Sequence, residues 1–192
     1  QQRQAVATAI DQDDTMRILR WALRMSLWAL PTLALAQGQA HQHGRLKLDI
    51  AVQARKLSLQ MESPLDNLVG FERAPRNDAE RKRVDAALAK LRAGQALFTI
   101  DPAAQCKLAK VELSSAALKL GAPAPAGKHS EHADIDATFE FDCQDTARAG
   151  FIDVGLFDAY AGMTRIEVQV VTPTAQRKHT LQRPARRVAL AR

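Results

Sequence analysis

Residues 128–143 read KHSEHADIDATFEFDC, and this stretch decides the fold of the chain. From residue 134 to residue 142 apolar and polar side chains alternate strictly. A sustained period of two predicts a β-strand with one buried face. The predicted core row is Ile135, Ala137, Phe139, Phe141 and Cys143, and the opposite row is Asp134, Asp136, Thr138, Glu140 and Asp142.

Outward from this stretch, the same alternation recurs in residues 45–52, 56–62 and 165–171. Shorter apolar runs predict a strand or turn at residues 97–100 and further strands at residues 110–118, 151–157 and 178–181. One helix is predicted between Asn77 and Gly94, because Asn77 and Glu80 have capping-box spacing and a glycine follows the run. Its apolar stripe is Val84, Ala87, Leu88 and Leu91. We therefore predict a mainly β, α+β fold, either an antiparallel sheet or a two-layer β-sandwich, with one amphipathic helix packed on it.

The N-terminal region has the pattern of a secretory signal. Residues 1–15 precede Met16, which is the more natural start. Residues 16–36 then combine three arginines, a short apolar core and an Ala-Leu-Ala exit, as a signal peptide does. The apolar core is shorter than the ~20 residues that a membrane span needs. We expect export, no membrane anchor and a single mature domain over residues 37–192, with an uncleaved N-terminal anchor as the alternative.

The chain contains two cysteines, Cys106 and Cys143. In an exported protein such a pair is typical of a disulfide. Closing this loop would stabilise the fold by roughly 3–4 kcal/mol in the chain-entropy model. A metal site that uses both thiolates is the alternative, although the spacing is not that of a C-x-x-C motif.

The net charge of the chain is +6, and basic residues gather near the C-terminus. The segment of about residues 182–192 is interpreted as a solvated basic tail, and binding of phosphate or of an anionic membrane surface is the alternative. Aromatic residues make up only 5% of the chain, and no nucleic-acid recognition motif is present. We therefore expect no nucleic-acid partner.

Histidines and carboxylates form two clusters, each at the start of a predicted strand. The first is His41 with His43, and the second contains His129, Glu131, His132, Asp134 and Asp136. Imidazole nitrogen and carboxylate oxygen are ligands that zinc accepts. If the two strands are neighbours, the clusters can converge on one ion. The predicted shell is His41, His43, His132 and Asp134, with His129, Glu131 and Asp136 as auxiliaries; solvated polar residues at strand ends are the alternative.

Five segments resemble the ZrgA-like family of periplasmic zinc-binding proteins. They are AHQHG at residues 40–44, ESP at 62–64, NLVGFE at 67–72, HAD at 132–134 and RIEVQV at 165–170. The resemblance implies Zn²⁺ binding in the periplasm and a role in zinc acquisition or buffering, with a periplasmic import system as partner. Similar proteins often have histidine after the G-F-E run, where this chain has Arg73.

Three classes of function remain open from the sequence. The leading one is a non-enzymatic protein that captures or buffers zinc and passes it to an importer. A zinc-dependent hydrolase is the second, but the chain contains no H-E-x-x-H motif, G-x-S-x-G elbow or P-loop. The third is a structural or partner-binding module without metal. We expect the protein not to be an enzyme.

Overall fold

A computed structural model describes residues 43–121 and 133–190 of the chain. The strands are β1 (Arg45–Val52), β2 (Lys56–Pro64), β3 (Phe98–Ile100), β4 (Lys107–Ser114), β5 (Asp134–Asp142), β6 (Phe151–Val154), β7 (Arg165–Val171), β8 (Gln176–Gln182) and β9 (Arg187–Ala189). The α-helices are α2 (Asp66–Val69), α3 (Asp78–Arg92), α4 (Gly94–Leu97) and α5 (Leu156–Ala159). Two 3₁₀ turns, η1 (Pro102–Ala104) and η2 (Thr146–Arg148), complete the described elements. The predicted signal segment lies outside the described residues.

Six strands form the large sheet in the order β4-β5-β2-β1-β7-β8. All neighbouring pairs are antiparallel except β1 and β7, which run parallel. The antiparallel pairing expected from the sequence thus holds for every neighbouring pair except β1 and β7, which makes the sheet mixed. The parallel pair is possible because a long connection between β1 and β7 carries the chain back to the same end of the sheet, as parallel pairing requires.

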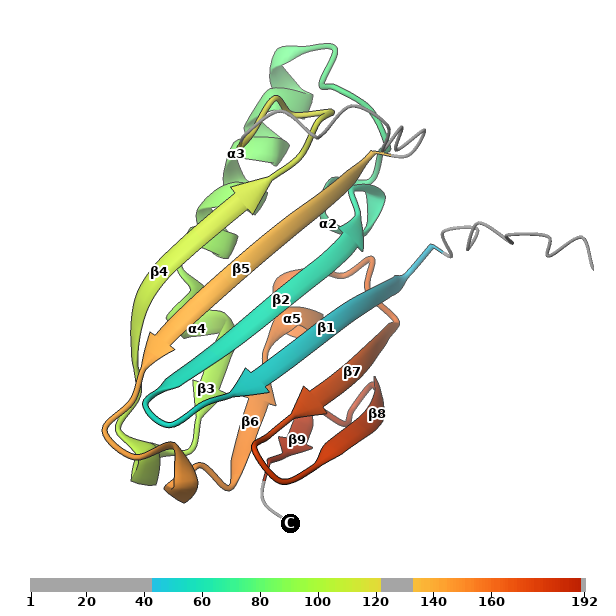
Figure 1. Cartoon of the computed structure of the whole chain (residues 1–192). Coiled ribbons are helices and arrows are strands. Elements are labelled where there is room, and N and C mark those ends of the chain that lie inside the picture. The colour runs from blue at the N-terminus through green and yellow to red at the C-terminus, as the bar shows by residue number, and fades with distance from the viewer. Residues whose placement is uncertain (1–42, 122–132, 191–192) are drawn as a thin grey trace, which may run out of the picture. The chain divides into compact units, whose positions relative to one another are not determined.

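The second sheet is smaller and has the order β3-β6-β9. In Figure 1, α3, α4 and the second sheet lie behind the large sheet, and no described helix or strand covers its other face. The described part of the chain is therefore a two-layer α+β arrangement, as predicted. Within the described residues, no helix is long and apolar enough to span a membrane.

The core is built from the rows that the alternation predicts. Ile135, Phe139 and Phe141 are at most 1% exposed, and the Phe139 ring packs edge-on against Phe98 with 4.9 Å between the ring centroids. Gly94 leaves room for this ring, because an added Cβ there would lie 2.5 Å from Phe139. The helix stripe is also buried: Val84, Ala87, Leu88 and Leu91. The predicted strand phase is confirmed.

Two segments near the second sheet differ from the predictions. Residues 151–157 form β6 only as far as Val154, and after Gly155 the chain turns into α5. The segment interpreted as a solvated tail contains β9, which pairs with β6 and buries Val188. Arg187 lies over the Phe151 ring and forms two hydrogen bonds of 2.7 Å with Asp153. Basic residues at this end therefore take part in the fold.

A disulfide joins Cys106 to Cys143, which are 37 residues apart in the sequence. The predicted pairing is present in the structure. Cys106 precedes β4 and Cys143 follows β5, and the register pairs Lys107 with Asp142 at the same end of these two strands. The bridge thus fastens the edge strand β4 to β5.

Candidate metal centre

One end of the large sheet gathers the start of β1, the end of β2 and the start of β5. The register pairs Lys47 with Glu62 and Pro64 with Asp134, so β1 and β5 begin at the same end with β2 between them. Strands two apart in a sheet are separated by roughly 9–10 Å. The topology therefore brings the starts of the two strands to one end of the sheet, as the hypothesis of a shared site requires.

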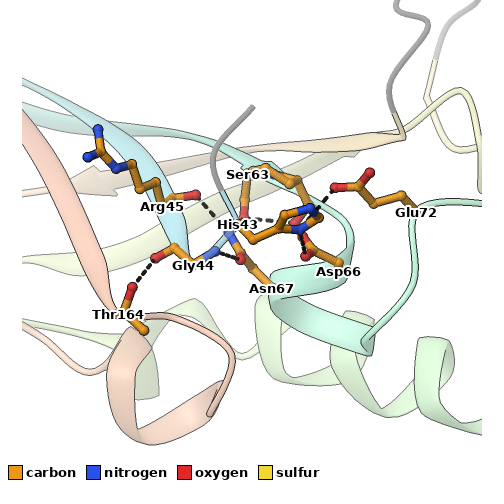
Figure 2. Close-up of polar contacts among 9 residues, drawn as sticks. His43, Gly44, Arg45, Ser63, Asp66, Asn67, Glu72 and Thr164 are labelled. Atoms are coloured by element: carbon orange, nitrogen blue, oxygen red, sulfur yellow. Dashed lines mark hydrogen bonds and ion pairs between the residues drawn. The ribbon is translucent and has the colours of Figure 1, made fainter. Parts of the chain in front are cut away.

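A buried asparagine organises the backbone at this end. Asn67 is 3% exposed, and its side-chain oxygen accepts a hydrogen bond of 2.7 Å from the Gly44 N–H. Its amide donates to the Arg45 carbonyl at 2.7 Å and to the Ser63 hydroxyl at 3.1 Å. Figure 2 shows these bonds. Asn67 thus ties the beginning of β1 and the end of β2 to helix α2.

Helix α2 is a single turn that ends in a glycine. Gly70 has φ of +83°, and its N–H bonds to the Asp66 carbonyl. This left-handed position is one that glycine adopts without strain. The helix places Asp66 in its first turn, and the bend after Gly70 leads into residues 71–76, where Glu72 lies.

Three side chains from separate segments meet beside Asn67. His43 precedes β1, Asp66 lies in α2 and Glu72 follows α2, and one ligand atom from each lies within 4.8 Å of the others. His43 Nδ1 forms a hydrogen bond with Asp66 Oδ2 and lies 3.7 Å from Glu72 Oε1. Figure 2 shows the imidazole between the two carboxylates. The imidazole is 75% exposed, whereas the carboxylate side chains of Asp66 and Glu72 are 19% and 33% exposed.

The donor set and spacing fit a zinc ion. In a tetrahedral shell with bonds of ~2.0–2.2 Å, neighbouring ligand atoms lie roughly 3.3–3.6 Å apart. The 3.7 Å between His43 and Glu72 is close to this value, and rotation of the Asp66 carboxylate would open its contact with His43. Because Asp66 Oδ1 is buried without a hydrogen-bond partner, this carboxylate has capacity for a further interaction.

The two carboxylates also set the protonation of the imidazole. The hydrogen bond that the imidazole donates to Asp66 raises the pKa of His43 above its usual value of 6.5, and the negative charges of Asp66 and Glu72 raise it further. A zinc ion at this point would take the place of the proton that the carboxylates stabilise. Zinc and proton therefore compete for His43.

Three of the seven predicted ligands lie within the described residues, and one of them belongs to the cluster. His43 joins the cluster, whereas Asp134 is half-buried and Asp136 is exposed, both in β5. The Asp134 carbonyl accepts a hydrogen bond from the Ser115 hydroxyl. The other predicted ligands lie outside the described residues: His41, His129, Glu131 and His132.

Sequence reasoning did not include Asp66 and Glu72 among the ligands. Glu72 belongs to the NLVGFE segment that carries the family resemblance, which could have identified it. Asp66 directly precedes that segment, and no periodic pattern distinguishes it.

The chain was compared with curated protein sequences and with models of protein families. No curated protein sequence matches the chain. The model of the ZrgA family zinc uptake protein matches residues 40–190, a range that contains His43, Asp66, Glu72 and both cysteines. The chain therefore belongs to the ZrgA family of zinc uptake proteins.

Proposed function

We propose that this protein captures Zn²⁺ at the cluster of His43, Asp66 and Glu72 and delivers it to an import system. Family membership gives the zinc-related role. The observation that supports capture at this place is the convergence of one imidazole and two carboxylates from three segments within 4.8 Å. Glu72 and Asp66 supply negative charge, and His43 supplies the nitrogen ligand that favours zinc over magnesium or calcium.

The surface position of the cluster suits transfer of the ion. His43 is largely exposed, so an acceptor protein can approach the bound ion and replace one ligand at a time. Three protein ligands leave the fourth position of a tetrahedral shell to water or to another side chain. His41, His132 and Asp134 remain the sequence-based candidates for that position.

The proposed role is binding and transfer without catalysis. A zinc hydrolase needs an activated water and a base beside it, whereas in this proposal both carboxylates of the centre are used as zinc ligands. The disulfide and the family together indicate an extracytoplasmic protein. We propose the periplasm as the compartment and residues 16–36 as the export signal.

Zinc titration of the purified protein against a competing chelator tests the proposal. The wild type should bind zinc, and His43→Ala, Asp66→Asn and Glu72→Gln should each weaken binding by about tenfold or more. Asp49→Asn is the matched control, because Asp49 is an exposed carboxylate of β1 outside the cluster. Unchanged affinity in all three cluster variants would exclude this centre.

A second set of variants locates the fourth ligand. His41→Ala, His132→Ala and Asp134→Asn are measured in the same titration. If one of these variants loses zinc affinity and the cluster variants do too, that residue is the fourth ligand of the same zinc ion. If these variants weaken binding while the cluster variants do not, zinc binds at the sequence-based shell instead.

A further inference from the structure

We propose that Arg73 is a positioning residue, which, held by Glu80, fixes the carboxylate of Glu72 at the metal centre. The inference rests on the proposed function, because it takes Glu72 to be a zinc ligand. The Arg73 side chain carries no atom that can bind a cation, so its effect on zinc must pass through its neighbours.

The loop that carries Glu72 has little backbone support. Residues 71–76 connect α2 to α3. Throughout the described ranges, no hydrogen bond between backbone groups involves these six residues. Without a backbone ladder the shape of such a loop depends on its side chains.

The strongest of these side-chain contacts is a two-pronged ion pair. The guanidinium of Arg73 donates to both oxygens of Glu80, at 2.7 and 2.9 Å. Glu80 also accepts a hydrogen bond of 2.7 Å from the Arg76 N–H and is 8% exposed. A fork-to-carboxylate pair fixes orientation as well as distance, so it attaches Arg73 to the first turn of α3.

The residue on the other side of Glu72 is attached to the same helix. The ring of Phe71 lies under the guanidinium groups of Arg73 and of Arg83 in α3, at 4.9 and 5.6 Å from the ring centroid. Both neighbours of Glu72 are thereby held against α3. The carboxylate between them remains beside His43, 3.7 Å from its Nδ1.

Positioning and simple electrostatics predict opposite results when the charge of Arg73 is removed. A nearby positive charge repels a bound cation. If charge alone mattered, Arg73→Gln would therefore tighten zinc binding. If Arg73 holds Glu72 in place, the same variant must weaken zinc binding because the ligand is released from its position.

The test is a zinc titration of the full chain, wild type and variants, against a competing chelator. Arg73→Gln should weaken zinc binding by about tenfold, the lower end of the range for residues that orient ligands. Arg73→Lys, which keeps the charge without the fork, should give a smaller loss. In the Glu72→Gln background the effect of Arg73→Gln should vanish. Arg81→Gln is the matched control, because it removes the same charge from a guanidinium that pairs with Asp78 within α3 and not with Glu80.

Several outcomes would overturn the inference. The inference is wrong if Arg73→Gln binds zinc as tightly as the wild type or more tightly. It is also wrong if Arg73→Gln lowers the zinc affinity of the Glu72→Gln variant as much as it lowers that of the wild type. The melting temperature in chelator, measured for every variant, shows whether each is folded, and Arg73→Lys replaces Arg73→Gln if the latter is not. A wild type that binds no zinc would refute the proposed function as well, whereas normal wild-type binding with an ineffective Arg73→Gln refutes this inference alone.

Discussion

Replacement of Asn67 by alanine should lower both the stability of the protein and its affinity for zinc. Asn67 forms three hydrogen bonds at one buried point, to the backbone of Gly44 and Arg45 and to the Ser63 hydroxyl. Each contributes about 0.5–1.5 kcal/mol net, so their loss should cost about 2–4 kcal/mol in the free energy of unfolding. The cost falls toward the upper end if the Gly44 N–H remains buried without a partner.

The effect on zinc follows from the place of Asn67 between two ligands. His43 precedes Gly44 and Asp66 precedes Asn67, so the Gly44–Asn67 bond holds the two ligand-bearing segments together. Asn67→Ala should therefore weaken zinc binding by about tenfold or more, as removal of a ligand-orienting contact does. Urea unfolding in chelator gives the stability, and zinc titration gives the affinity.

Thr146→Ala is the control for this experiment. Thr146 is a buried polar residue at the other end of the sheet, and its hydroxyl donates to the Gln53 and Ala54 carbonyls at 2.7 and 3.1 Å. Its loss should cost about 1–2 kcal/mol and leave zinc affinity unchanged. If Asn67→Ala costs less than about 1 kcal/mol, or destabilises without any change in zinc affinity, the role assigned to Asn67 is refuted.

Four further predictions concern the core, the disulfide, the Arg73–Glu80 ion pair and the protonation of His43. Phe139→Ala should destabilise the protein by about 3–5 kcal/mol in urea unfolding, because the ring is fully buried against Phe98; a cost near that of a surface substitution would contradict the packing. Denatured, unreduced protein should contain no free thiol, and Cys106→Ala/Cys143→Ala should lower stability by roughly 3–4 kcal/mol. Glu80 has its pKa lowered to about 2 by Arg73 and the Arg76 N–H, so its contribution to stability is present above its usual 4.5 and is lost as pH falls from 4.5 toward 2; Glu80→Gln should flatten the stability profile in that window, and an unchanged profile would disprove the ion pair. Because the pKa of His43 is raised above 6.5, zinc affinity should begin to fall above that pH as the solution is acidified, and calorimetry in buffers of different ionisation enthalpy should detect proton release near neutral pH.

The elements that the sequence predicts correctly are those with a periodic pattern of apolar and polar residues. Strict alternation identified the buried rows of β1, β5 and β7, since each of these strands has one face on the core. Alternation says nothing about which strands are neighbours, so the parallel pairing of β1 with β7 was not predicted. The apolar run of residues 151–157 predicts one strand, because periodicity alone does not separate a short apolar strand from a helical turn, and the structure divides the run between β6 and α5.

The candidate site was harder to predict because it lies where periodicity ends. Its three groups come from the residue before Gly44, from a one-turn helix and from a loop that, within the described residues, has no hydrogen bond between backbone groups, and none of these segments has a repeating pattern. Glu72 lies in one of the segments that carry the family resemblance, but only the fold brings it close to His43.

The turn at Gly44 directs the His43 side chain towards Asp66 in α2. Side chains alternate between faces only while the backbone is extended, and β1 begins at Arg45. Gly44 has φ of +79°, and an added Cβ would lie 2.5 Å from the Thr164 hydroxyl, which donates to the Gly44 carbonyl. The strand phase therefore cannot be extended back through Gly44. The direction of His43 depends instead on this turn, which Thr164 holds from the β7 side and Asn67 holds from α2, so the imidazole is delivered to Asp66 and Glu72 by contacts that only the folded chain makes.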